Sequence, residues 1–471
     1  RFALTSSPMS SPLSSPINAR RARLYPADRP WRMACLLLAL WAGLPLLPGH
    51  GNPPAGAGQA WAQDGGGDDG GDDGDGGAGG GRAGAAGTRG GDGRSDSDTG
   101  IQEPAPRVDP GRSVAQELVG VNPSAAALRR AGALGLQVVQ TQRLGQLGLV
   151  VVRLRVPPGL DARTALALAE ERDPGVFDLH HRFRLQQGNR TETPAGACDL
   201  PGCEPLAQIG WPASARCGAG QTVGLVDGPV ARSATGLRGL DLQQRRLAPP
   251  GSPPADEDHG TAVALLLAGQ PSGGFQGLLP AARLRVAVPF YRLPDGQVSA
   301  DAFDLAASLD WLVGQGTDVI GLSLSGPPNR VLAAAVREAQ ARGAVLVAAV
   351  GNEGRAAPPA HPAALDGVLG VTALAADGRL YWRAGQGAQV DFALPGVGVS
   401  VPQPDGQLQR RNGTSFAVPY LVAQVSQSLA EGRTAARQWR DGSAIPVNDL
   451  GPRGRDDQYG WGLPRPVLQC R

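Results

Sequence analysis

The sequence predicts an α/β protein: a doubly wound, mostly parallel sheet preceded by a small ferredoxin-like α+β module. From about residue 190, short apolar runs alternate with helical segments, which is the order of a parallel sheet with helices on both faces. Residues 108–187 follow a β-α-β-β-α-β order. Residues 63–107 are rich in Gly and Asp and poor in large apolar side chains, so they predict a flexible acidic linker without a core of its own.

The module at 108–187 is predicted from its apolar runs and from the two helical segments between them. Ser124 precedes the first helical segment as its expected N-cap. The expected strands are 117–121, 136–140, 148–156 and 176–185, and the expected helices are 124–134 and 162–172. This order occurs in many unrelated proteins, so it does not by itself indicate a function.

The large domain, residues 188–471, is predicted from buried-type strands that alternate with helices. The expected strands are 221–226, 284–289, 318–324, 344–350 and 367–373, and the expected helices are 261–269, 301–316 and 331–343. Binding sites in such sheets form at the carboxyl ends of the strands. Asp227, Ser325 and Asn352 all follow predicted strands.

The stretch RNGTSFAVPYLVA, residues 411–423, breaks a local rule. Pro419 stands four residues after Ser415, and proline lacks the N–H that a helix would bond to the Ser415 carbonyl. Broken local rules concentrate at functional sites. A serine at a helix N-terminus lies beside free N–H groups that favour negative charge, although the same residues would also suit an ordinary helix cap.

Composition excludes several classes of function. The formal net charge of the 471 residues is +2, which favours neither nucleic acid nor an anionic membrane surface as a partner. The sequence contains no lysine. Schiff-base chemistry, a P-loop and a Ser-Lys dyad are therefore excluded.

Residues 1–62 are interpreted as an N-terminal extension and secretory signal, with Met33 as the expected start. Arg29 and Arg32 precede Met33, and the apolar run 34–47 follows it. This run is too short to span a membrane comfortably, although an uncleaved anchor is an alternative. The expectation is export to the periplasm or the medium, with no stable membrane partner.

Cysteine usage agrees with an oxidising compartment. Of five cysteines, Cys35 lies in the predicted signal segment, and Cys198, Cys203, Cys217 and Cys470 remain. An even number predicts disulfides, with three pairings open. A zinc site is the alternative, but the sequence has no second close pair of cysteines to complete it.

Histidine is scarce enough to narrow the search for a general base. Of five histidines, His50 lies by the signal and His180 and His181 lie in the small module. In the large domain, His259 begins a helix and is followed by Gly260, which allows close approach of backbone. His361 stands between prolines, where a loop role is expected.

These motifs resemble those of the subtilisin-like serine peptidases, the subtilases, over residues 205–465. TVGLVDGPV resembles the family's aspartate motif, DHGTAVALLLAG its histidine motif, AAVGNEG its oxyanion segment and GTSFAVP its serine motif, in the family's order. The resemblance implies a serine endopeptidase in which Asp227 orients His259, His259 is the general base and Ser415 is the nucleophile. Asn352 is implied to donate to the oxyanion.

The resemblance also implies where a peptide substrate binds. LSLSG (322–326) resembles the segment that pairs with an extended peptide, and the implied substrate-binding residues are Leu324, Ser325, Gly326, Ala349 and Gly351. Residues 108–187 resemble a propeptide that acts as intramolecular chaperone and inhibitor, so self-cleavage is expected between residues 186 and 200. The implied partners are protein or peptide substrates, and no nucleic acid.

Several positions depart from the family pattern, and other functions remain as alternatives. Gly228, Pro229, Ala262, Tyr420 and Leu421 replace the residues usual beside the motifs, which affects substrate preference more than chemistry. No cofactor is expected, and calcium, frequent in the family, has no assignable carboxylate cluster. An α/β-hydrolase esterase is excluded by residue order. A Glu/Asp-based serine peptidase would not need the histidine, and a catalytically silent subtilase-fold binding protein is the main alternative.

Overall fold

The structure is a computed structural model that describes residues 112–186, 189–190, 203–212, 214–403, 407–432, 436–442 and 445–470. The interpretations of residues 1–62 and 63–107 lie outside these residues. Within the described residues, no helix combines the length and apolar character needed to cross a membrane.

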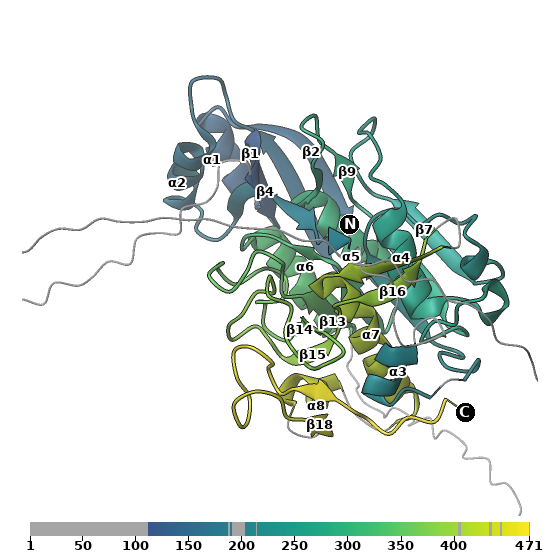
Figure 1. The fold of residues 1–471 in the computed structure, drawn as a ribbon. Helices are drawn as coiled ribbons and strands as arrows, with labels where there is room; N and C mark the ends of the chain where they lie inside the picture. The colour runs from purple at the N-terminus through teal and green to yellow at the C-terminus, as the bar shows by residue number, and fades with distance from the viewer. Residues whose placement is uncertain are drawn as a thin grey trace, which may run out of the picture. The chain divides into compact units, whose positions relative to one another are not determined.

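The small module has the predicted order of elements. Its elements are β1 (Ser113–Val121), α1 (Ala125–Ala133), β2 (Gln137–Leu144), β3 (Leu149–Arg155), α2 (Ala162–Glu170) and β4 (Phe177–Leu185). The strands form an antiparallel sheet in the order β2-β3-β1-β4. Ser124 caps α1, since its side chain accepts a hydrogen bond from the Ala127 N–H. Both helices cover one face of this sheet (Figure 1).

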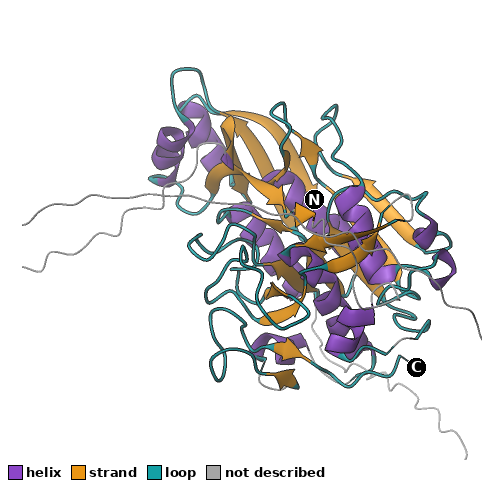
Figure 2. Ribbon diagram, viewed as in Figure 1, coloured by secondary structure: helices purple, strands orange, loops and turns teal. Residues whose placement is uncertain are grey.

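The large domain is built on a seven-stranded sheet in which every strand is parallel, in the order β15-β14-β13-β11-β6-β8-β7. The strands are β6 (Thr222–Val226), β7 (Leu242–Arg246), β8 (Arg283–Val288), β11 (Val319–Leu322), β13 (Val345–Ala349), β14 (Leu369–Leu374) and β15 (Phe392–Pro395). Helices α4 (Asp258–Ala268) and α7 (Thr414–Ala430) cover one face, and α5 (Ala302–Gly314) and α6 (Arg330–Ala341) cover the other. The predicted fold class is confirmed (Figure 2).

The central sheet differs from the prediction at three of its strands, since β15 (Phe392–Pro395) was not predicted and β11 and β7 differ as follows. The strand expected at 318–324 ends at Leu322, and β12 (Leu324–Ser325) leaves the central sheet to pair with β4 of the small module. Strand β7 was not predicted, because in LQQRR only Leu242 is buried and the other positions lack an apolar pattern.

Helices α5 and α6 lie between two sheets. Their buried side chains pack against the central sheet through Ile320 and Leu346 and against the module's sheet through Val119 and Val151. Because both faces of this helical layer are covered, α5 is apolar around most of its circumference. The small module is therefore packed against the large domain through a continuous hydrophobic core.

Short elements complete the described part of the chain. A hairpin of β16 (Val399–Pro402) and β17 (Leu408–Asn412) is joined by β5 (Asn189–Arg190). Strands β9 (Tyr291–Arg292) and β10 (Val298–Asp301) extend the module's sheet beyond β4. The remaining elements are α3 (Cys203–Ile209), α8 (Ala436–Asp441), β18 (Val447–Asn448), β19 (Leu463–Pro464) and 3₁₀ turns at Thr235–Leu237 and Pro271–Gly273.

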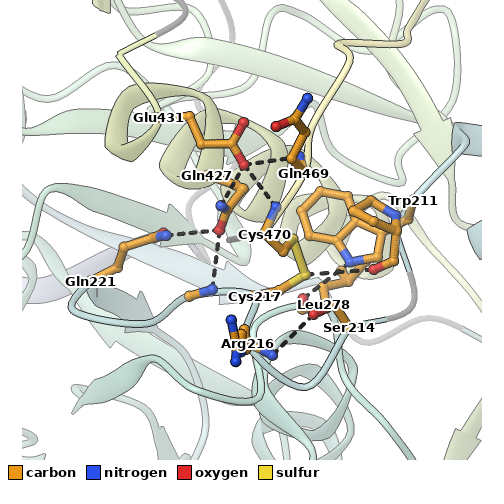
Figure 3. Close-up of a disulfide and its surroundings, with 12 residues drawn as sticks. Trp211, Ser214, Arg216, Cys217, Gln221, Leu278, Gln427, Glu431, Gln469 and Cys470 are labelled. Atoms are coloured by element: carbon orange, nitrogen blue, oxygen red, sulfur yellow. Dashed lines mark hydrogen bonds between the residues drawn. A yellow bond between two sulfur atoms is a disulfide. The ribbon is translucent and has the colours of Figure 1, made fainter. Parts of the chain in front are cut away.

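A disulfide joins Cys217 to Cys470 across 253 residues of sequence. Figure 3 shows Glu431 beside it, where one carboxylate oxygen accepts hydrogen bonds from the Gln469 and Cys470 N–H groups. The bond and this carboxylate hold the last described residues against the loop that leads into β6. The side chains of Cys198 and Cys203 lie outside the described part of the structure.

Candidate active site

The N-terminus of α7 places Ser415 in the interior. Helix α7 begins at Thr414, contains Pro419, and is buried along most of its length against β11, β13, β14 and β15. Gly413 is the N-cap residue and Ser415 is fully buried. The serine is therefore a residue inside the first turn and not the capping residue.

Ser415, His259 and Asp227 form a continuous chain of polar contacts. The His259 Nδ1 atom lies 2.7 Å from the Asp227 Oδ1 atom, and the His259 Nε2 atom lies 2.9 Å from the Ser415 Oγ atom. Because a carboxylate can only accept, Nδ1 carries the proton and Nε2 is left as an acceptor facing the hydroxyl. This arrangement allows the histidine to take the serine proton.

Glycine at position 260 is required by close packing of the histidine helix on the aspartate loop. A Cβ atom at Gly260 would lie 2.2 Å from the Gly228 carbonyl oxygen and 2.6 Å from that of Pro229. Both residues follow Asp227 directly, so the close approach brings the start of α4 against the end of β6. The expectation that Gly260 admits neighbouring backbone is confirmed.

Asn352 has a donor that no described group accepts. Its Oδ1 atom accepts hydrogen bonds from the Thr414 N–H and the Thr414 hydroxyl, both at 3.0 Å. Since the Thr414 N–H can only donate, the opposite end of the amide must be the NH₂ group. Asn352 is buried and its Nδ2 atom has no hydrogen-bond partner among the described residues, as a donor held ready for a developing oxyanion would be.

The end of the small module enters this site. Strand β4 pairs antiparallel with β12, with Arg184 opposite Ser325 and Leu185 opposite Leu324, and the Gln186 N–H donates to the Ser323 carbonyl at 3.0 Å. The Gln186 carbonyl oxygen accepts a hydrogen bond from Ser415 Oγ at 2.7 Å. Gln186, the residue after β4, thus presents its carbonyl to the serine.

The Gln186 side chain lies beside two polar groups. Its Nε2 atom donates to the Ser325 hydroxyl and lies 3.2 Å from the Glu353 Oε1 atom. Gly351 has φ of +96°, and a Cβ atom there would lie 2.6 Å from the Glu353 Oε2 atom. A side chain at position 351 would therefore displace the carboxylate that contacts Gln186.

Of the other predicted substrate-binding residues, Gly326 packs against the small module, whereas Ala349 lies in the core of the large domain. Gly326 leaves room for the Phe183 ring, because an added Cβ atom would lie 2.3 Å from it. Ala349 ends β13 with its side chain in the main core, so its role stays a prediction. His361 exchanges backbone hydrogen bonds with Gly326, and burial lowers the pKa of its ring.

A buried histidine cluster lies between the module and the large domain, away from Ser415. It consists of His180, Glu117, Arg153, Asp301 and Asp304, contributed by β4, β1, β3, β10 and α5. The His180 Nδ1 atom lies 2.8 Å from the Glu117 carboxylate, and its Nε2 atom lies 3.0 Å from the Asp301 carboxylate.

The carboxylates set the charge of this cluster. Burial lowers the pKa of His180, but the Asp301 and Glu117 carboxylates together outweigh it and raise the pKa to about 9. Burial, with the Asp301 charge, raises the pKa of Asp304 to about 8. At neutral pH the histidine is therefore a cation held between two carboxylates.

No metal centre is found among the residues that the structure describes, since no three His, Cys, Asp or Glu side chains gather there in a suitable arrangement.

Comparison with known proteins identifies the family. Residues 218–462, more than half of the chain, match the model of the subtilase family, Peptidase_S8. The chain belongs to the subtilase family of serine peptidases.

Among curated relatives, minor extracellular protease Epr of Bacillus subtilis is 31% identical over 213 residues, which are 44% of this chain and 32% of Epr. Subtilisin DY of Bacillus licheniformis is 29% identical over 256 residues, which are 52% of this chain and 89% of subtilisin DY. The match thus spans about a third of the length of Epr.

Among solved structures, the chain is similar to fervidolysin from Fervidobacterium pennivorans, a keratinolytic enzyme related to subtilisin. The TM-score is 0.62 at 20% identity, over 76% of this chain and 61% of fervidolysin. It is also similar to the epidermin leader peptide processing serine protease of Staphylococcus aureus, with a TM-score of 0.55 at 14% identity, over 75% of this chain and 97% of that one. These similarities show the fold.

Sequence reasoning placed self-cleavage between residues 186 and 200, but it did not identify Gln186 or Glu353 as residues of the site, and it did not predict β17, the strand that leads into α7. Gln186 directly follows the last predicted strand of the module, and this position could have indicated that its carbonyl reaches Ser415. Glu353 follows Asn352 in the predicted oxyanion segment but has no motif of its own. Strand β17, with the sequence LQRRN, lacks the alternation of apolar residues that predicts a strand.

Proposed function

We propose that this chain is an exported serine endopeptidase that first cleaves its own precursor and then other polypeptides. The catalytic residues are Ser415 as nucleophile, His259 as general base and Asp227 as the group that orients the imidazole. The observation that carries the proposal is the position of Ser415 Oγ, 2.9 Å from the His259 Nε2 atom and 2.7 Å from the Gln186 carbonyl oxygen.

The reaction follows from these contacts. Rotation of the Ser415 hydroxyl toward His259 transfers its proton to Nε2 while Oγ bonds to the Gln186 carbonyl carbon. The carbonyl oxygen becomes an oxyanion, to which the Asn352 NH₂ group donates. Collapse of this intermediate breaks the bond after Gln186, and Nε2 gives its proton to the leaving amine. Water then releases the acyl group from Ser415 by the same steps.

Asp227 supports the charged histidine that forms during these steps. Its Oδ1 atom also accepts a hydrogen bond of 2.6 Å from the Gly228 N–H, and the residue is fully buried. A buried carboxylate held by two donors keeps the imidazole in one tautomer and stabilises its cation.

The small module acts as a folding partner and inhibitor in this proposal. It packs on α5 and α6 through the shared core and lays residues 183–186 along β12. Cutting after Gln186 leaves these contacts in place, so the released module would remain bound as a product. Export, by the signal predicted at residues 34–47, belongs to the same proposal.

The test compares the purified full chain with Ser415→Ala. The unmodified chain is expected to yield a fragment beginning at Gln187, identified by N-terminal sequencing and mass spectrometry, and then to hydrolyse peptides. Ser415→Ala should remain intact under the same conditions. Equal fragment release by both proteins would refute self-cleavage, and failure of the processed protein to react with a fluorophosphonate would favour a catalytically silent binding protein.

A further inference from the structure

The His180 cluster crosses the boundary that self-cleavage would create. The small module provides His180, Glu117 and Arg153, all on its strands. The large domain provides Asp301, at the end of β10, and Asp304, in the first turn of α5. Strand β4, which carries His180, also pairs antiparallel with β10. The cluster is therefore part of the contact that a cleaved module must break in order to leave.

The contact between His180 and Asp301 joins the two parts of the chain in the interior. The His180 residue is fully buried and Asp301 is 2% exposed, and the His180 Nε2 atom lies 3.0 Å from the Asp301 carboxylate. Asp301 is also the N-cap of α5, since its Oδ1 atom accepts a hydrogen bond of 3.1 Å from the Asp304 N–H. Because the pair is withdrawn from solvent, its attraction depends strongly on whether His180 carries its proton.

At neutral pH the charges of the cluster balance. Two cations, His180 and Arg153, face the carboxylates of Glu117 and Asp301. Burial raises the pKa of Asp301, but the His180 charge outweighs it and keeps that pKa below its usual value. The fifth group, Asp304, is protonated, because burial and the Asp301 charge raise its pKa to about 8. The docked module therefore leaves no net charge buried in the cluster.

Neighbouring groups do not change this balance between neutral and mildly alkaline pH. The adjacent His181 on β4 is neutral, because burial lowers its pKa to about 4. Burial also raises the pKa of Tyr291 on β9 above its usual value. The other charged neighbours are arginines, which keep their charge throughout: Arg182 on β4, Arg246 on β7 and Arg163 on α2.

Alkaline pH removes the balance through two groups at once. As the pH rises through about 8 and then about 9, Asp304 loses its proton and His180 becomes neutral. Both pKa values lie above the ordinary ones, so the protonated forms favour the docked state and their contribution is lost as the pH rises. One cation, Arg153, then faces three carboxylates inside the contact, and unbalanced buried charge is costly.

We propose that the His180 cluster is an alkaline release switch for the small module. It keeps the cleaved module over Ser415 at neutral pH and lets the module leave when the medium becomes alkaline. This inference rests on the proposed peptidase function and concerns its regulation. Because β4 leads from His180 directly to Gln186, loss of its pairing with β10 also loosens the residues that lie along β12.

The size of the effect follows from the two pKa values. That of His180 moves from 6.5 to about 9, and that of Asp304 moves from 3.8 to about 8. Linkage of these two protons to docking predicts that the dissociation constant of the cleaved module rises about 100-fold to 1000-fold between pH 7 and pH 10. Without a titrating group at position 180, the rise that remains from Asp304 is about tenfold or less.

The experiment uses the full chain after self-cleavage, diluted to a series of concentrations between pH 6 and pH 10. Hydrolysis of a chromogenic anilide of Phe-Arg-Leu-Gln is measured at once and again after the module has been digested completely. The ratio of the two rates gives the fraction of enzyme that is free of module. Because both rates are measured at the same pH, the ionisation of the active site cancels. We expect the free fraction to rise steeply above pH 8.

Three variants locate the switch. His180→Gln, whose amide takes up no proton, should bind the module more weakly at pH 7 and show only the small rise. Asp304→Asn, which stays neutral at every pH, should lower the rise by about tenfold. His181→Asn is the matched control, because it replaces the adjacent buried histidine, which is already neutral, and its rise should equal that of the unmodified protein.

The outcomes separate this switch from the peptidase function. If the chain neither cuts itself nor hydrolyses the anilide at any pH, the peptidase function is refuted. If the anilide is hydrolysed but the dissociation constant is the same at pH 7 and pH 10, the switch is refuted, as it is if His180→Gln rises as steeply as the unmodified protein or if His181→Asn loses the rise. Where His180→Gln does not fold, Asp304→Asn decides, and an undiminished rise overturns the proposal.

Discussion

Replacement of Asn352 separates two functions of one amide. Its Nδ2 group is the unpaired donor, while its Oδ1 group accepts both hydrogen bonds from Thr414. Asn352→Ala removes both, and Asn352→Asp keeps an acceptor for Thr414 but loses the donor. The rate of cleavage should depend on the donor, and the free energy of unfolding should depend on the acceptor.

The expected loss of kcat and the expected loss of unfolding free energy differ between the two variants. Loss of one oxyanion donor lowers kcat by about 10²–10³, a value taken from a subtilisin asparagine, so both variants should show at least that loss with little change in KM. Only Asn352→Ala leaves the buried Thr414 N–H unpaired, which lowers the free energy of unfolding by about 1–3 kcal/mol.

The assay is self-cleavage of the full chain together with peptide hydrolysis under saturating conditions. Urea unfolding is measured in a Ser415→Ala background, where autolysis does not interfere. A kcat within threefold of the unmodified enzyme for both variants would refute the role of Asn352 as an oxyanion donor.

Three further outcomes are expected. The pKa of His180 is raised to about 9, so the stability that its charged form contributes is full below about pH 6.5 and is lost as the pH rises through 9. The urea midpoint of the Ser415→Ala chain should therefore fall between pH 7 and pH 9.5. A fall of equal size when His180→Asn is added would contradict this assignment. Replacing Cys217 and Cys470 together by alanine opens a loop of 253 residues and should lower the free energy of unfolding of the Ser415→Ala chain by about 5 kcal/mol. An unchanged urea midpoint would show that the disulfide does not stabilise the fold. Glu353→Gln should reduce cleavage after Lys and Arg relative to cleavage after Gln by a few fold, because the negative charge of an exposed acceptor is lost. Profiling of cleavage sites in a denatured proteome would measure this ratio. An unchanged ratio would show that the Glu353 carboxylate does not select the residue before the cut.

Motifs with a strict chemical requirement were predictable from the sequence. Asp227, His259 and Ser415 were assigned because their motifs resemble those of the subtilases, and the structure brings the three side chains into contact. The parallel sheet was predictable because its strands β6, β11, β13 and β14 are apolar runs bounded by turn residues.

Features that depend on pairing between distant segments were not predictable. Strand β12 has only two residues, and its partner in β4 lies about 140 positions earlier, so no local pattern marks it. Strand β17 has the sequence LQRRN, with no alternation of apolar residues, so no local pattern marks it either. The contact of Glu353 with Gln186 likewise arises only when the module is docked.

The disulfide between Cys217 and Cys470 also affects how well a peptidase resists autolysis. Chain ends fray, and frayed segments are the first to be cut. Cys470 ties the last described residues to Cys217, which lies shortly before β6. The bond thus restrains the last described residues, and an autolytic nick between Cys217 and Cys470 would leave the two fragments covalently joined.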